Sequence, residues 1–168
     1  MKVALRIVAL IFSGLVCTVI AMIPFVPALP SITSPDLLAA LCCFWVMRRP
    51  ETAPLPVIFL LGLAADLLLM RPVGLGALVL VLMTEALRTQ VVALRDVSRF
   101  VEWMIFAAFF TLATLGMLGV IWVTFAEVPP LGAMAQRIVL TVACYPLVGV
   151  VVRVLFGVTR RTASGVRV

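Results

Sequence analysis

The sequence predicts an all-α integral membrane protein, a compact bundle of about six transmembrane helices with cytoplasmic N- and C-termini. Composition gives the class, because 65% of the 168 residues are hydrophobic and only 12% are charged, whereas soluble domains are roughly half apolar and a quarter charged. Hydrophobic patterning and the distribution of basic residues then give the number of spans and their orientation. We expect residues 1–168 to form a single transmembrane domain.

Six apolar segments follow one another along the chain. Lipid offers no hydrogen-bond partner to the backbone, so each segment is expected to be helical. Prolines, glycines and arginines mark the breaks between them. The expected spans are residues 7–23, 31–47, 53–70, 73–87, 100–125 and 135–156.

The first two segments need separate arguments. Segment 7–23 follows a basic start, as a signal peptide does, but it exceeds the usual apolar stretch of about 7–15 residues, so we expect a retained span. In the second segment the fully apolar part, residues 37–47, covers only about 16 Å as a helix. If it crosses, it must be short, tilted or partly shielded by protein.

The distribution of basic residues favours six crossings. With a cytoplasmic N-terminus and six spans, eleven of the 13 basic residues face the inner side, and only Arg71 and Arg137 face the outer side. If the second segment is skipped, the ratio falls to nine against four at best. The positive-inside rule therefore predicts six spans with both termini inside.

The third and fourth segments are expected to form a hairpin. As one helix, residues 53–87 would be roughly 50 Å long, and the hydrocarbon core is only about 30 Å thick. Gly62 and Asp66 lie one turn apart in the third segment, so the glycine permits close approach of another helix on the side that carries the carboxylate.

The fifth segment has tryptophans near both ends, Trp103 and Trp122, which are about 28 Å apart along a helix and fit the two interfacial belts. Residues 88–99 precede it, and the spacing of Arg88, Arg99 and Glu102 predicts an amphipathic cytoplasmic link on the inner leaflet. This link either only holds the orientation or docks a cytoplasmic partner. Residues 157–168 form a basic cytoplasmic tail.

The composition excludes most enzymatic chemistry. The chain has no histidine, and its four cysteines lie within apolar runs without a CxxC pair, so no common metal-ligand set or Ser-His or Cys-His pair is available. Nucleotide-binding glycine loops are also absent. We therefore expect no enzyme, no catalytic residue, no cofactor, no metal and no nucleic-acid partner.

Two acidic side chains fall inside the expected spans, where an ionised group costs about 2.5–3.5 kcal/mol. Glu85 lies one turn before Arg88 and can pair with it. Asp66 precedes the turn between the third and fourth segments, so it could accept hydrogen bonds from the amides that open the fourth, or pair with Arg71. A proton or cation site is the alternative, but the sequence indicates no second polar group nearby.

Two local patterns resemble the MreD family of rod shape-determining proteins. The first is a Pro-Asp pair that opens an apolar run, where Asp36 is also expected to complement a helix dipole. The second is a Gly-x-x-x-Asp pattern followed by Pro-x-Gly-x-Gly. The matching positions, which we take as structural or partner candidates, are Pro35, Asp36, Gly62, Asp66, Pro72, Gly74 and Gly76.

The resemblance implies a non-enzymatic scaffold of the cell-wall elongation machinery in the bacterial inner membrane. Its implied partners are the single-span protein MreC, the peptidoglycan polymerase and transpeptidase pair, the MreB filament indirectly, and membrane lipid. The family also resembles the substrate-binding S-components of energy-coupling transporters. A small-solute, vitamin-like binding subunit therefore stays open as the alternative function.

Overall fold

The computed structural model describes residues 2–23, 34–91, 98–123 and 130–157, and these residues form helices and no strand. The all-helical prediction is confirmed. The elements are α1 (Lys2–Met22), α2 (Leu37–Arg48), the short 3-10 helix η1 (Pro50–Thr52), α3 (Leu55–Leu68), α4 (Leu75–Gln90), α5 (Arg99–Val123) and α6 (Leu131–Phe156).

Each of the six expected segments contains one helix, with ends that differ by a few residues. Of the expected link at residues 88–99, residues 88–90 continue α4 and Arg99 begins α5. Residues 92–97 of that link lie outside the described residues, as does the basic tail after Gly157.

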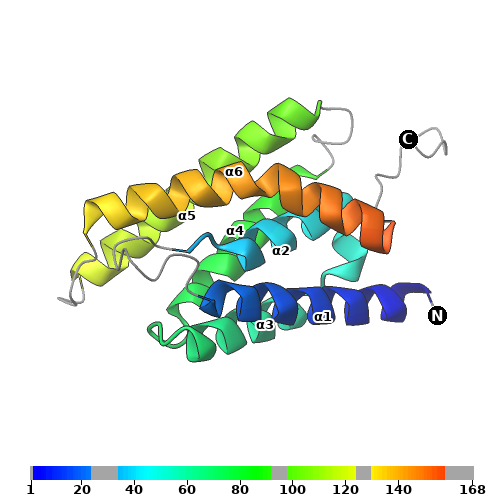
Figure 1. The fold of residues 1–168 in the computed structure, drawn as a ribbon, viewed down its shortest axis with the longest axis horizontal. Coiled ribbons are helices and arrows are strands. Elements are labelled where there is room, and N and C mark those ends of the chain that lie inside the picture. Colours follow the sequence, from blue (N-terminus) through cyan, green and yellow to red (C-terminus); the bar gives the residue numbers. More distant parts are fainter. Residues whose placement is uncertain (1, 24–33, 92–97, 124–129, 158–168) are drawn as a thin grey trace.

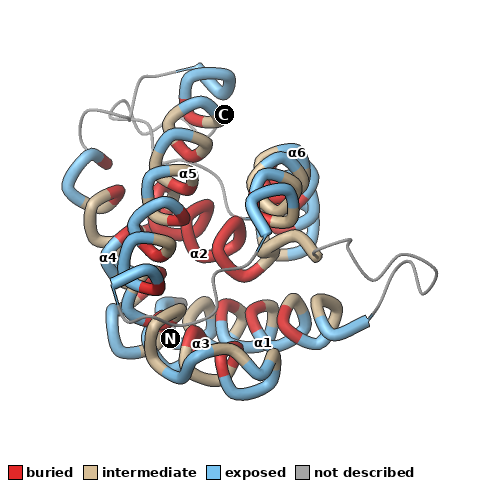
Figure 2. The backbone as a smooth tube through the Cα atoms, turned by 90° about the vertical axis from the view of Figure 1, so that its left-hand side faces the viewer, coloured by how far each residue is buried: buried red, intermediate tan, exposed pale blue. Residues whose placement is uncertain are grey.

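Helix α2 lies at the centre of the bundle. Its residues from Leu38 to Met47 are all buried, and it packs against α1, α4 and α6. Figure 2 shows this buried helix surrounded by helices whose outer sides are exposed. At 12 residues it is about 18 Å long, which is shorter than the thickness of the hydrocarbon core, about 30 Å. Of the three alternatives expected for this segment, short, tilted or partly shielded by protein, the structure shows a short helix that the protein shields.

Helices α3 and α4 form the expected hairpin and pack closely. A Cβ atom added to Gly62 would lie 2.8 Å from Cα of Ala77 on α4, so only glycine fits there without a backbone shift. The predicted role of Gly62 in close helix approach is confirmed.

The outer surface of the bundle is apolar. Large exposed hydrophobic side chains occur along α1, α5 and α6, for example Phe12, Leu112 and Val154. Among the described residues, these three helices are long and apolar enough to cross a membrane, and α2 and α3 are shorter apolar helices. Helix α1 begins and α6 ends at the same end of the molecule, on the right in Figure 1.

Candidate functional site

Asp36 joins the start of α2 to α6. Its carboxylate caps α2, because Oδ1 accepts a hydrogen bond of 3.2 Å from the amide of Ala39. Its own backbone N–H donates to the hydroxyl of Thr141 on α6 over 2.9 Å. The expected role of Asp36 at a helix N-terminus is therefore confirmed, since this carboxylate faces the positive end of the helix dipole.

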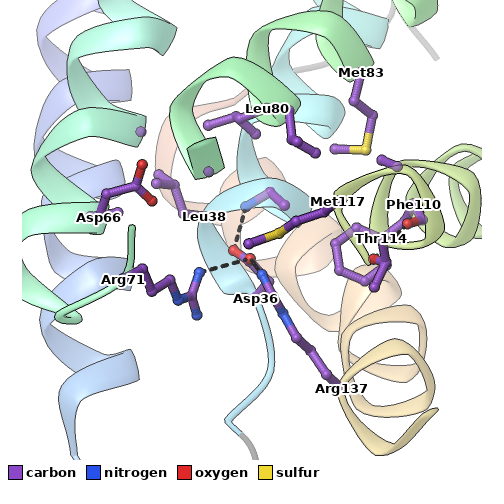
Figure 3. A pocket seen from close by; sticks show the side chains of 16 residues that line it. Asp36, Leu38, Asp66, Arg71, Leu80, Met83, Phe110, Thr114, Met117 and Arg137 are labelled. Carbon is purple, nitrogen blue, oxygen red and sulfur yellow. Dashed lines mark hydrogen bonds and ion pairs between the residues drawn. The ribbon is translucent and has the colours of Figure 1, made fainter. Parts of the chain in front are cut away.

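Two arginines from distant segments converge on the same carboxylate. Nη1 of Arg71, in the turn between α3 and α4, lies 3.4 Å from Oδ2 of Asp36, and Nη2 of Arg137 on α6 also donates to Oδ2. Figure 3 shows Asp36 between the two guanidinium groups. Because the three side chains come from three parts of the chain, this ion cluster ties the α3–α4 hairpin and α6 to the start of α2.

Asp66 binds the start of α4 instead of a side chain. It is 2% exposed, and its Oδ2 accepts hydrogen bonds of 3.0 Å from the amides of Gly74 and Ala77. These amides belong to the helix start, where no intrahelical partner exists. The prediction that Asp66 accepts from the amides of the fourth segment is confirmed. The alternative, a pair between the side chains of Asp66 and Arg71, is wrong. Instead, the backbone N–H of Arg71 donates to the backbone carbonyl oxygen of Asp66, over 3.0 Å.

The remaining motif positions shape the two turns. Gly74 has a φ of +89°, a conformation that residues with a Cβ rarely adopt. A Cβ on Gly76 would overlap the Asp66 carboxylate, so glycine lets that side chain reach the helix start. The carbonyl groups of Pro35 and Pro72 accept hydrogen bonds from Leu37 and Leu75 at the starts of α2 and α4.

A small cavity of about 50 Å³ joins these groups. The sequence indicated no second polar group near Asp66, but folding brings polar residues from the start of α2, the α3–α4 turn, α5 and α6 to the edge of this cavity. One sign was present in the sequence: the two arginines that depart from the positive-inside bias are the two in this cluster. The polar side chains that line the cavity are Asp36, Asp66, Arg71, Thr114 and Arg137.

A second polar cluster, which the sequence reasoning missed, lies at the other end of α2. Arg48 donates to both oxygens of Glu102 on α5, at 3.2 and 2.9 Å, and the Tyr145 hydroxyl on α6 donates to the same carboxylate over 3.0 Å. Glu102 is 1% exposed. Its expected place on the polar face of a surface link is therefore wrong, because the periodicity identifies a face without showing what packs against it.

Arg88 closes this end of the bundle from α4. It donates to the carbonyl oxygens of Pro50 and Ala53, at 3.0 and 2.5 Å, and pairs with Glu85 over 2.9 Å. The predicted Glu85–Arg88 pair is confirmed. Arg88 also holds the connection between α2 and α3, which the sequence did not indicate.

These clusters bind the fold together instead of presenting reactive groups. Each buried carboxylate accepts from named donors of this chain. Within the described ranges, no three His, Cys, Asp or Glu side chains gather as metal ligands would. Cys42 and Cys43 are buried free thiols, whereas Cys17 and Cys144 are only partly buried.

The apolar outer surface, the long apolar helices and the internally paired charges define a helical membrane protein. The sequence profile described as rod shape-determining protein MreD matches residues 1–128. The chain therefore belongs to the MreD family, which implies a role in determining rod shape. No curated protein and no solved structure matches it. The seven candidate residues lie within the matched part, and their contact with a partner stays a prediction.

Proposed function

We propose that this chain is a non-enzymatic inner-membrane scaffold of the cell-wall elongation machinery. It binds the single-span protein MreC and supports the peptidoglycan polymerase and transpeptidase pair, and the MreB filament acts alongside. Membership of a rod shape-determining family supports the cellular role. The named partners come from what the family resemblance implies.

The observation that carries this proposal is that three carboxylates inside the bundle, of which Asp66 and Glu102 are buried and Asp36 is partly buried, are already bound within the fold. Asp36 and Glu102 bind arginines, and Asp66 binds backbone amides. A general base needs a carboxylate that can reach the proton it abstracts, whereas these three are occupied by the fold itself. Such pairing suits a rigid bundle that functions by binding partners at its surface and not by catalysing a reaction.

We further propose that all six helices cross the membrane with both termini in the cytoplasm. The common end at which α1 begins and α6 ends (Figure 1) supports this arrangement. Arg71 and Arg137 then face the outer side, where Asp36 offsets part of their charge. The second helix, α2, crosses while surrounded by the other helices. The likeness to S-components stays a prediction.

The size of the polar cavity favours the scaffold over a vitamin-binding subunit. Sites for small organic ligands typically have volumes of about 300–1,000 Å³ and several convergent polar groups. The cavity beside Asp36 has a volume of about 50 Å³, which suits a few water molecules.

Affinity purification of the tagged chain from its native membrane, followed by mass spectrometry, tests the proposal. We expect an MreC-like single-span protein and wall-synthesis components to remain bound in mild detergent. Recovery of an ATPase with a coupling subunit would move the function to transport. Repeated isolation of the chain alone at native expression levels would exclude the scaffold.

A further inference from the structure

An apolar groove runs along the outer face of the bundle between α4 and α5. Its volume is about 360 Å³. On α4 it extends from Leu75 to Ala86, and on α5 from Phe109 to Val120, which is about 17 Å along each helix. Leu82 and Leu112 on its two walls are 60% and 68% exposed. The groove is therefore as long as about three turns of a helix.

Gly116 lines this groove. A Cβ added to it would meet no atom of the described residues within 4 Å. By contrast, the space beside Gly62 is filled by Ala77 and the space beside Gly149 by Phe44. A glycine in a helix interior lowers helix stability by about 1 kcal/mol relative to alanine. At Gly116, no close packing against the described residues offsets this loss. Small residues at such positions let a second helix approach closely within lipid.

The groove and the polar cavity share a wall. Val79, Met83, Ala113 and Met117 line both spaces. Methionine side chains are flexible and adapt to a neighbouring group. The two spaces are therefore adjacent, and the two methionines are the adaptable part of the wall between them.

That cluster holds more hydrogen-bond donors than acceptors. A guanidinium group has five N–H donors, and Arg71 and Arg137 both direct one nitrogen to a single oxygen of Asp36. Within the described part of the chain, Nε of Arg137 is buried and makes no hydrogen bond. Asp66 is already held by the amides of α4. The two arginines are matched in number by Asp36 and Asp66, but their unused N–H donors can bind a further acceptor, and a carboxylate is the acceptor that a guanidinium group binds most strongly.

We propose that the α4–α5 groove seats the single transmembrane helix of a partner, and that an aspartate or glutamate of this helix pairs with Arg71 and Arg137. The inference rests on the proposed scaffold function and specifies its binding surface. A helix fits better than an acyl chain, because a flexible chain fits many surfaces and gains no specific advantage from a glycine.

Site-specific photocross-linking in native membranes tests the position of the partner. A photoreactive amino acid replaces Leu82 or Leu112 in the groove, and Phe12 on α1 or Leu147 on α6 serves as an equally exposed control. We expect groove positions alone to give an adduct that maps to a transmembrane segment containing Asp or Glu. Adducts with lipid only, with a second copy of this chain, or only from the control positions would overturn the inference.

Two matched glycine variants test the groove itself. Gly116→Leu fills the groove, whereas Gly119→Leu makes the same change three residues later, also in open space but outside the groove lining. We expect Gly116→Leu to reduce the recovered partner by about tenfold or more, a change of about 1.4 kcal/mol. Gly119→Leu should leave recovery unchanged. Equal recovery with both variants, at equal levels of folded chain, would contradict the proposal.

The variant Arg71→Gln tests the proposed contact between the arginines and a carboxylate of the partner. Arg71 is chosen because its 3.4 Å contact with Asp36 is the longer of the two ion pairs. Partner recovery, compared at equal levels of folded chain, should fall, and unchanged recovery would exclude the carboxylate contact. If the wild-type chain recovers no partner, the scaffold function fails and this inference with it. If it recovers a partner that cross-links only elsewhere, the scaffold stands and the groove assignment is wrong.

Discussion

At the scale of single residues, Asp66 on α3 caps the N-terminus of α4. The first amides of a helix have no intrahelical acceptor, and here the carboxylate of the preceding helix supplies one for Gly74 and Ala77. The motif spacing of Asp66, Gly74 and Gly76 thus has a direct physical reason: the carboxylate can reach the amides only where no Cβ is in the way.

Replacement of Asp66 by alanine should destabilise the chain. It leaves buried amides without an acceptor, at a cost of about 1–3 kcal/mol for each. Thermal unfolding in detergent measures the loss. Glu85→Ala is the control, because it removes a partly exposed ion pair, which contributes at most about 1 kcal/mol. An equal loss in both variants would show that Asp66 does not cap α4.

The sequence allowed the helix-capping roles of Asp66 and Asp36 to be predicted, but not the ion pairs of Asp36. The amides that Asp66 binds lie a few residues away, across a turn that proline and glycine mark. Asp36 binds Arg137, which is 101 residues away, and no local pattern reports such a contact. Only the departure of both arginines from the charge bias hinted that they are neutralised.

At the scale of elements, some glycines lie where a neighbouring helix leaves no room for a Cβ atom, and others face open space. Gly62→Ala should destabilise the α3–α4 hairpin by about 1–3 kcal/mol, because its Cβ would lie 2.8 Å from the backbone of Ala77. Gly119→Ala meets open space and should stabilise α5 by about 0.5–1 kcal/mol. Chemical unfolding of both variants measures the difference, and a shift of the same sign in both would contradict this packing.

The Arg48–Glu102 pair connects α2 with α5. Both side chains are buried, at 7% and 2% exposure, so Glu102→Leu should cost about 3 kcal/mol or more by leaving the guanidinium without this carboxylate in an apolar setting. The double variant Arg48→Met with Glu102→Leu should be more stable than Glu102→Leu alone. A double-mutant cycle of unfolding free energies measures the coupling, and additive losses would show that the pair is not coupled.

Helix positions follow from the sequence because lipid forces apolar segments into helices. The order of packing does not follow, because the few polar residues on each helix do not identify the helix that packs against them. Helix α2 is the shortest of the six α-helices, and the shortness of its apolar part indicated that it is short, tilted or partly shielded by protein. The placement of Glu102 failed because a polar periodicity on α5 suits either water or a buried partner.

At the scale of the whole molecule, six crossings place Met70 and Glu51 on opposite sides of the membrane. Each can be replaced by cysteine in a chain whose four native cysteines are changed to alanine. Both positions are exposed, at 94% for Met70 and 46% for the Glu51 side chain. A membrane-impermeant maleimide added to intact cells should label Met70→Cys and not Glu51→Cys. Labelling of both, or of Glu51→Cys alone, would contradict the six-span arrangement.

The central claim is that this chain acts by holding a partner in the membrane. Native mass spectrometry of the chain, extracted gently at its native expression level, tests the claim most directly. We expect a complex heavier than the 18.2 kDa chain by the mass of at least one single-span protein. A single species of 18.2 kDa in repeated preparations would contradict the scaffold account.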